Sequence, residues 1–261
     1  MARETLAVLG SPIDVLSWQE ALSRIAQWAA ARESRYVCIC NVHSVVTATR
    51  DEEFTAVVRN ADMATPDGAP VAWLIHKQLR CAQERINGPD LMWRYLSESA
   101  AQGGPIFLYG ATEETLKILC ARLVRKFPDV RIAGAYSPPF RALTETEDSK
   151  VVEMINSSGA TTVWVSLGCP KQEKWMAEHR GRIQAVMIGV GAAFDYHAGT
   201  IRRAPMWMQR NGMEWLHRLA SEPGRLSKRY LVTNSLFVFL AARQLLAGAP
   251  ISRTFEKDRT K

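Results

Sequence analysis

The stretch PIFLYGATEETLKILCARLVRKFPDVRIAGA, residues 105–135, decides the fold class of this chain. It opens with an apolar run that ends at Tyr109, and Gly110 marks the turn that follows. From Thr112, a residue type that caps helices, the pattern becomes helical as far as Lys126. A second short run follows at 130–135. An apolar strand, a crossover helix and a further strand are the repeating unit of a parallel sheet.

The same alternation of short apolar runs and longer helical patterns continues through the first 200 residues. Most of the runs are almost continuously apolar, as expected for strands that are covered on both faces. We therefore predict an α/β fold with a mainly parallel sheet and crossover helices. Thr144, followed by Glu147, predicts a capping box at the start of one helix. The predicted strands are 36–40, 105–109, 130–135, 161–167 and 185–190. The predicted helices are 17–31, 44–60, 69–77, 89–101, 112–126, 144–156 and 171–180.

The pattern changes after Ala204 and Pro205, where helical segments continue without strands between them. No repeat or low-complexity linker interrupts the residues before this point. We therefore interpret 1–204 as one α/β domain and 205–250 as a helical appendage. The polar, charged end of the chain, 251–261, is predicted to be disordered.

The positive charge of the chain is concentrated in one place. The formal net charge is +7, and residues 202–230, here called the basic segment, hold seven basic residues against two acidic ones. Trp207, Trp215 and Tyr230 lie in the same segment. This composition indicates a partner that is anionic and lies beside an apolar surface.

The N-terminus lacks the long apolar core of a secretory signal, and no run of about 20 apolar residues offers a bilayer span. The five cysteines are odd in number and contain no Cys-x-x-Cys pair, which favours reduced thiols over a disulfide framework or a zinc site. These features predict a folded protein of the cytoplasm.

Ligands of open parallel sheets bind beyond the carboxyl ends of the strands, so the loops after the predicted strands are the candidate sites. Glycine in these loops lets the backbone approach a ligand, and backbone amides at helix starts suit phosphate. The set therefore fits a nucleotide-type ligand. The polar or glycine-rich loops are 41–43, 65–70, 85–90, 110–112, 168–173 and 189–195.

Three side chains in these loops have two interpretations each. Asp67, in a Thr-Pro-Asp-Gly turn before an apolar helix, is either the N-cap of that helix or a general base that reaches a substrate hydroxyl. Arg85 is either a solvated surface charge or a phosphate ligand. Gln172 either caps a helix or donates a hydrogen bond to a leaving group. The local sequence does not decide between these alternatives.

Several kinds of enzyme are disfavoured by the motifs. Gly189 and Gly191 begin a dinucleotide fingerprint, but Phe194 stands where its third glycine belongs, which argues against a nicotinamide enzyme. The five histidines show no metal-ligand spacing, and no Asp-x-Asp or Gly-x-Ser-x-Gly motif occurs. We therefore expect no metal and no cofactor, and phosphate charge would be met by arginine, lysine and helix termini.

Read together, the loops resemble the WecG/TagA/CpsF family of bacterial glycosyltransferases. The resemblance runs in order from residue 41 to residue 230, which makes it specific. The matching motifs are Asn41, Asp67-Gly68, Arg85-x-x-Gly88-x-Asp90, Gly168-x-Pro170-x-Gln172-Glu173, Gly191-Ala192-x-Phe194-Asp195, Arg203-Ala204-Pro205, Gly212-x-Glu214-Trp215, Glu222-Pro223 and Arg229-Tyr230.

The resemblance implies a Rossmann-like fold and an inverting, metal-independent transfer of a sugar from a UDP-sugar to a polyprenyl-diphosphate-linked sugar. It places this reaction in cell-surface polysaccharide synthesis. Asp67 is similar to the proposed catalytic base of the family, and Gln172 and Asn41 fall among its active-site residues. Ile39 stands where a threonine is often found, so Thr65 is a candidate for its role. Substrate-binding roles are expected for Thr65, Arg85, Asn87, Gly88, Asp90, Gly110, Gly168, Lys171, Gly189, Gly191 and Asp195.

The resemblance also gives the basic segment a role at the inner face of the cytoplasmic membrane, in binding the lipid diphosphate. Residues 231–246 are too short and too interrupted by Asn234 and Arg243 to span a bilayer, so we expect peripheral binding. An apolar stripe on the appendage is also compatible with a homo-oligomer. The arginines expected to bind lipid or diphosphate are Arg203, Arg210, Arg218, Arg225 and Arg229.

The main alternative is a nucleotide- or nucleic-acid-binding α/β protein without transferase activity. A basic segment is compatible with nucleic acid on charge alone, but its aromatic residues favour a membrane interface and we expect no nucleic-acid partner. The donor sugar stays open between UDP-N-acetylmannosamine, its uronic acid, UDP-glucose and other UDP-sugars.

Overall fold

The structure, a computed structural model, describes residues 2–99, 104–247 and 251–255. The chain forms two compact units. Unit 1 consists of Met1–Trp18, Cys40–Ile86 and Arg203–Lys261, and unit 2 of Gln19–Ile39 and Asn87–Arg202. The predicted α/β part, 1–204, therefore contributes residues to both units, whereas the predicted appendage belongs to unit 1.

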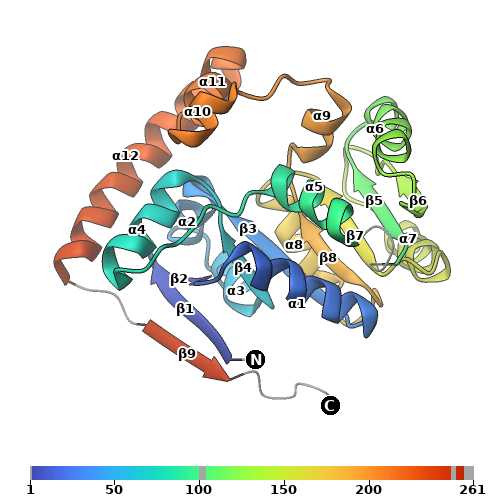
Figure 1. The fold of residues 1–261 in the computed structure, drawn as a ribbon, viewed down its shortest axis with the longest axis horizontal. Helices are drawn as coiled ribbons and strands as arrows, with labels where there is room; N and C mark the ends of the chain where they lie inside the picture. Colours follow the sequence, from blue (N-terminus) through green and yellow to red (C-terminus); the bar gives the residue numbers. More distant parts are fainter. Residues whose placement is uncertain (1, 100–103, 248–250, 256–261) are drawn as a thin grey trace. The chain divides into compact units, whose positions relative to one another are not determined.

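A six-stranded sheet has the order β4-β3-β8-β7-β5-β6 (Figure 1). The pairs β3·β8, β8·β7, β7·β5 and β5·β6 are parallel, with Arg35 opposite Val186 and Phe107 opposite Val163. The predicted α/β fold class is confirmed, and each of the five predicted strands is present. The strands are β3 (Arg35–Cys40), β4 (Met63–Pro66), β5 (Ile106–Gly110), β6 (Ile132–Tyr136), β7 (Thr162–Ser166) and β8 (Val186–Gly189).

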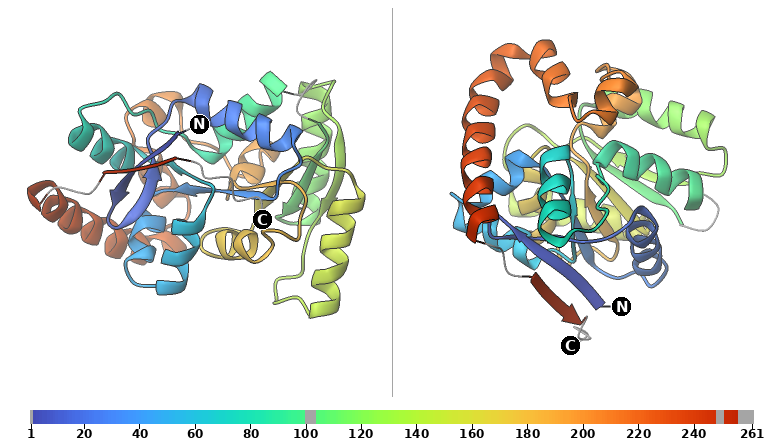
Figure 2. Two further views of the ribbon diagram at one scale, coloured as in Figure 1. Left: turned by 90° about the horizontal axis from the view of Figure 1, so that it is seen from below. Right: turned by 60° about the vertical axis from the view of Figure 1, so that its left-hand side comes forward.

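The helices of unit 2 cover its strands and bury large aromatic side chains. Trp164 of β7 is fully buried and lies 5.5 Å, between ring centroids, from Tyr95 of α5. Helices α5 and α6 both pack on α9 (Figure 2). There, Trp93 of α5 stacks on His197 of α9 with 4.5 Å between the ring centroids. Thr112 caps α6 and Thr144 forms the predicted capping box at α7. The helices are α1 (Trp18–Ala30), α5 (Gly88–Ser99), α6 (Glu113–Lys126), α7 (Glu145–Ser157), α8 (Lys171–Glu178) and α9 (Ala193–Ala198).

Strands β5 and β7 are neighbours in the sheet, but their connections run in opposite directions. From β5 the chain passes through α6 to β6 at one edge of the sheet, and from β7 it passes through α8 to β8 on the other side. A crevice beyond the carboxyl ends of two such strands is the usual ligand site of open α/β sheets. Gly110 lets the two ends approach, because its φ is 113° and a Cβ there would collide with the carbonyl oxygen of Ser166. The topology therefore predicts a ligand site between β5 and β7.

Unit 1 contains a three-stranded antiparallel sheet of order β2-β1-β9, with β4 beside β2. Arg3 donates two hydrogen bonds of 2.8 Å to the buried carboxylate of Asp14, which also accepts one from Ala64 N–H of β4. This network ties the hairpin to β4. The strands are β1 (Ala2–Val8), β2 (Ser11–Asp14) and β9 (Ile251–Phe255).

The last and longest helix of unit 1, α12, packs on α2. Near its end Gln244 donates to the carbonyl oxygen of Ala7 and accepts from Leu9 N–H. Leu226, Phe237 and Ala241 are the buried apolar residues of α12. The helices are α2 (Val42–Ala48), α3 (Glu52–Asn60), α4 (Ala69–Leu79), α10 (Met206–Arg210), α11 (Glu214–Ser221) and α12 (Pro223–Ala247).

Two predictions about local structure are corrected. The predicted helix 44–60 is two helices, because Asp51 accepts a hydrogen bond from Phe54 N–H and starts α3 as a new helix. Residues 251–255, predicted to be disordered, form β9, whose backbone pairs with β1. Residues 256–261 of that tail lie outside the described part of the chain.

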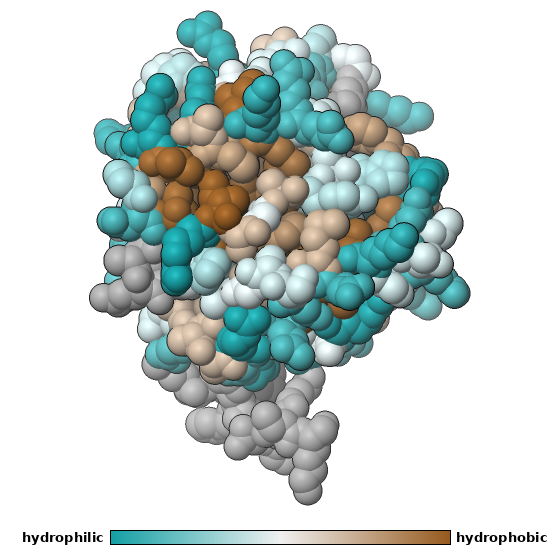
Figure 3. Space-filling model, turned by 90° about the vertical axis from the view of Figure 1, so that its right-hand side faces the viewer, coloured by the Kyte–Doolittle hydropathy of each residue, from teal (hydrophilic) through white to brown (hydrophobic). Residues whose placement is uncertain are grey.

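The side of the molecule that carries α6 and α7 is mostly hydrophilic, with hydrophobic residues gathered in one area (Figure 3). On elements of this side, Val124 is 52% exposed, Met154 41% and Phe140, in the loop after β6, 91%. The Phe140 loop also borders the ligand cavity described below.

Candidate active site

Asp67 follows β4 directly, and its N–H donates to the carbonyl oxygen of Cys40 at 2.9 Å. The N-cap of α4 is Gly68, which has a φ of 85°, and no side chain caps this helix. The interpretation of Asp67 as the N-cap is therefore wrong. Its carboxyl group is held at the start of α4 without a capping task, which leaves it available for chemistry.

The environment of Asp67 makes its carboxyl group a stronger base than an ordinary aspartate. Burial raises its pKa to about 6, and the negative charge of Glu214 adds to the rise. The positive charge of Arg85 and hydrogen bonds from Gly68 N–H and the Asn41 side chain act in the opposite direction. The group is therefore mostly ionised at neutral pH and still accepts a proton readily.

Arg85 is not a solvated surface charge, because its side chain is only 18% exposed. It donates from Nη1 to Oε2 of Glu214, and Arg203 donates from Nε to Oε1 of the same carboxylate at 3.1 Å. Two arginines from distant parts of the chain thus share one carboxylate beside Asp67. Glu214, at the start of α11, was absent from the predicted site.

Asn41 and Thr65 hold the backbone around Asp67. Asn41 is the N-cap of α2, accepts from Ser44 N–H at 3.2 Å, and reaches Asp67 as well. Thr65 is buried and donates to the carbonyl oxygen of Ile86 at 3.1 Å, so its hydroxyl fixes the segment that leads from Arg85.

Gln172 lies in unit 2 and uses both ends of its side-chain amide. Its Oε1 accepts from Gly191 N–H at 3.0 Å, and its Nε2 donates to Oε1 of Glu173 at 2.8 Å. Ser166 Oγ donates to the carbonyl oxygen of Gly191 at 2.7 Å. A Cβ at Gly189 would lie 3.0 Å from Gln172 Nε2. These contacts join the loops after β7 and β8, and they give Gln172 a structural role inside the unit.

Four further predicted substrate residues of unit 2 also make local contacts. Asn87 donates to Asp90 Oδ2 at 2.7 Å and accepts from Asp90 N–H at 3.0 Å, which starts α5. A Cβ at Gly88 would lie 2.7 Å from the carbonyl oxygen of Val190, so this glycine allows close packing. Asp195 accepts from Thr200 Oγ1 at 3.2 Å.

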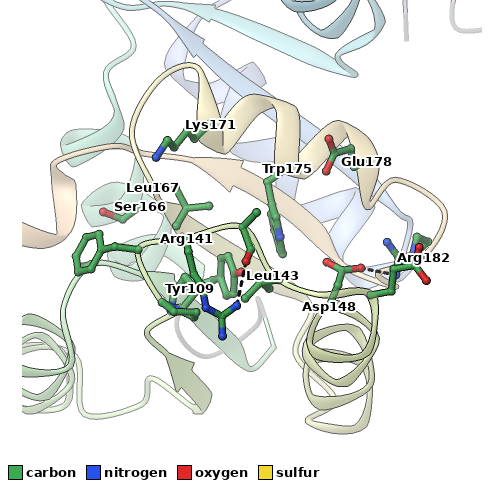
Figure 4. A pocket seen from close by; sticks show the side chains of 16 residues that line it. Tyr109, Arg141, Leu143, Asp148, Ser166, Leu167, Lys171, Trp175, Glu178 and Arg182 are labelled. Carbon is green, nitrogen blue, oxygen red and sulfur yellow. Dashed lines mark hydrogen bonds and ion pairs between the residues drawn. The ribbon is translucent and has the colours of Figure 1, made fainter.

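A cavity of about 470 Å³ lies where the topology predicts a ligand, beyond β5 and β7 (Figure 4). The Trp175 ring of α8 reaches into it and stacks on Tyr109 at 4.3 Å between centroids. Lys171, from the first turn of α8, and Arg141 border it (Figure 4). The lining residues are Tyr109, Ala111, Pro138, Pro139, Phe140, Arg141, Ala142, Leu143, Glu145, Asp148, Ser166, Leu167, Lys171, Trp175, Glu178 and Arg182.

The charges around the cavity are partly paired. Arg141 donates to both oxygens of Glu147 at 2.7 Å, and Asp148 accepts from Arg182 at 2.6 Å. Lys171 is the one residue of the cavity lining that the sequence analysis had placed in the site. The predicted Gly110 and Gly168 are adjacent in sequence to the lining residues Tyr109 and Leu167. Tyr109 was missed because a buried aromatic at the end of an apolar run indicates a core residue as much as a ligand contact. Trp175 was missed because an aromatic residue inside a helix has the same two interpretations.

The basic segment forms α10, α11 and the start of α12. Arg210 is exposed and Arg218 half-buried, and the side chains of Arg225 and Arg229 lie outside the described part of the chain. Trp215 packs edge-on against Tyr230 at 6.2 Å. Within the described residues, no group of three or more histidine, cysteine or acidic side chains gathers as metal ligands would.

The expectation that the chain contains no segment long and apolar enough to cross a membrane is corrected. Leu226–Ala247 of α12 is 22 residues long and contains an 18-residue stretch with a mean hydropathy of 1.3, which is sufficient by length and composition alone. Asn234 and Arg243 do not lower this mean hydropathy enough to exclude a membrane span. Length and composition do not distinguish a spanning helix from one that lies on a surface.

A family model described as "Glycosyl transferase WecG/TagA/CpsF family" matches residues 6–250. The chain belongs to this family. It is also 30% identical over 226 residues to N-acetylglucosaminyldiphosphoundecaprenol N-acetyl-beta-D-mannosaminyltransferase of Bacillus subtilis (strain 168), covering 85% of this chain and 84% of that protein.

Membership of the WecG/TagA/CpsF family makes the protein a glycosyltransferase. The alternative of a nucleotide- or nucleic-acid-binding protein without transferase activity is therefore set aside. The family model extends from β1 through α12, so the basic segment lies within the matched residues.

Proposed function

We propose that the protein transfers an N-acetylhexosamine from a UDP-sugar to a polyprenyl-diphosphate-linked N-acetylglucosamine, with inversion and without a metal. The lipid acceptor and the sugar class are suggested by the name of the Bacillus subtilis relative. The observation that carries the proposal is the carboxyl group of Asp67. It is partly buried, does not cap α4, has a pKa of about 6, and is contacted by Asn41 and flanked by Arg85.

In this reaction an acceptor hydroxyl oxygen attacks the anomeric carbon from the face opposite the leaving UDP. A C–O bond forms, the bond from the anomeric carbon to the phosphate oxygen breaks, and its electron pair leaves with UDP. Asp67 takes the hydroxyl proton. One displacement inverts the anomeric centre and needs one base, which must be ionised, so the rate rises as the pH rises through about 6.

We assign the nucleotide part of the donor to the cavity beyond β5 and β7. Its volume of about 470 Å³ is in the range of small-ligand sites, and its position is the topological switch point of the sheet. Trp175, whose ring stacks on the buried Tyr109, supplies aromatic surface for a base, and Lys171 supplies a cation for phosphate at the start of α8.

We assign the membrane contact to the appendage. On α12, Leu231 is 73% exposed, Val238 and Phe239 are each 66% exposed, and Leu246 is 91% exposed. The opposite side of the helix packs on α2, which favours a helix that lies on the membrane surface over one that spans it. The exposed Arg210 and its neighbours in the basic segment would meet anionic groups there, at the cytoplasmic face.

The test uses purified protein, a panel of UDP-sugars with UDP-N-acetylmannosamine first, and a polyprenyl-diphosphate-N-acetylglucosamine acceptor, with EDTA present throughout. We expect transfer by the parent protein and loss of at least roughly a hundredfold in Asp67→Asn, since the base is removed. UDP binding, measured by calorimetry, should be retained.

The matched control is Asp62→Asn, which makes the same change at the residue before β4 instead of the residue after it, and which should keep the transfer rate of the parent. Full activity of Asp67→Asn would exclude Asp67 as the base. Activity that appears only when Mg²⁺ or Mn²⁺ replaces EDTA would contradict the metal-independent reaction.

A further inference from the structure

The turn between α10 and α11 approaches the start of α4 very closely. Gly212 in this turn has a φ of 70°, and a Cβ there would lie only 2.5 Å from the Cβ of Ala69. A residue other than glycine would push the turn away. The approach brings Glu214, two residues later, to the same end of α4 at which Asp67 lies two residues before Ala69.

Glu214 engages both arginines of this centre. Its carboxylate accepts from Arg85 through Oε2 and from Arg203 through Oε1. All three side chains are about one-fifth exposed, so the cluster is partly shielded from water. Among the described ion pairs of unit 1, none joins Arg85 to Asp67; the guanidinium group is directed to Glu214 instead.

We propose that Glu214 is a positioning residue of the catalytic centre: it holds the Arg85 guanidinium away from Asp67, so that the Asp67 carboxylate stays unpaired and basic. This inference rests on the proposed role of Asp67. It makes α11 part of the catalytic centre through a carboxylate, in addition to any lipid contact that the arginines of the basic segment make.

The electrostatics agree with this geometry. The charged groups that face Asp67 are Arg85, from the segment after α4, and Glu214, from α11; from α2 the neutral Asn41 side chain faces it, and Arg203 faces Glu214. Arg85 lowers the pKa of Asp67 and Glu214 raises it. Without the Glu214 charge, Arg85 would act on Asp67 unopposed and could pair with it directly.

The experiment compares the pH dependence of kcat/KM for the parent protein, Glu214→Gln and Glu84→Gln. Glu84 is an exposed carboxylate beside Arg85 in the sequence, so its change controls for net charge. The acid limb of the profile is the range in which kcat/KM rises with pH as Asp67 ionises. For Glu214→Gln we expect this limb to move to lower pH by about one unit. We expect the rate on the plateau to fall roughly three- to tenfold because the base is weaker. Glu84→Gln should match the parent.

A contact that only docks α11 would lower the rate without moving the acid limb, so the limb is the deciding readout. If Asp67→Asn is inactive but Glu214→Gln leaves the limb in place, the role of Glu214 is overturned and the proposed function stands. If Asp67→Asn retains activity, the base assignment fails and this inference fails with it.

Circular dichroism checks that Glu214→Gln is folded. If it is not, Gly212→Ala replaces it, because this change keeps the carboxylate and moves the turn away from Ala69. The acid limb should then move in the same direction by a smaller amount, and an unmoved limb in a folded Gly212→Ala protein would overturn the proposal.

Discussion

Glu173 holds a carboxyl group almost out of contact with water, since only 1% of the residue is exposed. Burial raises its pKa from 4.5 to about 7, although hydrogen bonds from Gln172 and Cys169 lower it. Between these two values the folded protein keeps the proton and the unfolded chain does not. Because the folded state binds more protons there, this group makes stability fall as the pH rises through that window.

Glu173→Gln removes the ionisable group and keeps an oxygen that can accept from Gln172. We expect the variant to gain stability relative to the parent between about pH 5 and about pH 8, by up to about 3 kcal/mol. Urea unfolding at both pH values measures this difference, and groups common to the two proteins cancel. Parallel pH dependences would show that Glu173 does not titrate in this range.

At the residue scale, the sequence could predict side chains that follow strands in polar loops, such as Asp67 and Gln172. It could not predict which of their alternatives applied, because that depends on hydrogen bonds: the N-cap role of Asp67 is taken by Gly68, and the amide of Gln172 is used by Gly191 and Glu173. Glu214 looked like one of two acids in a basic segment, since its partners lie far away in the chain.

Among the elements, the central strands were predictable because they are continuous apolar runs in a sheet covered on both faces. Strands β1, β2, β4 and β9 were missed, because they are short or polar and are defined by pairing with distant segments. The same reasoning applies to the cavity. Its position follows from strand order, which sequence periodicity does not reveal, and its lining comes from β5, β7, α7 and α8 and from the loops that follow β5, β6 and β7.

Helix α8 offers a matched pair of lysines for testing the donor cavity. Lys171 lines it, whereas Lys174, one turn later, does not. We expect Lys171→Gln to weaken UDP binding about tenfold or more, as the loss of a hydrogen bond between charged groups would. Lys174→Gln should bind as the parent does. Calorimetric titration with UDP measures both, and equal affinities would place the diphosphate elsewhere.

For the whole molecule, the appendage is both a packing element and a candidate membrane surface. Truncation after Ala204 would remove Glu214 and uncover the face of α2 on which α12 packs, so a loss of transfer in that variant would have several causes. Substitutions of exposed side chains distinguish a loss of membrane contact from a loss of packing, because exposed side chains contribute little to packing. Val238 and Phe239 are adjacent on α12 and each is 66% exposed.

We therefore expect the double variant Val238→Ser, Phe239→Ser to fold and to bind UDP like the parent, but to float less with anionic vesicles and to transfer more slowly to a lipid acceptor. Removing this apolar area should weaken vesicle binding roughly tenfold or more. Transfer to a short-chain, water-soluble acceptor should be unchanged, since the Asp67 centre is intact. Val124→Ser, on α6 and 52% exposed, is the matched control and should behave as the parent in each assay. If the double variant floats and transfers as well as Val124→Ser does, the exposed side of α12 is not the membrane contact.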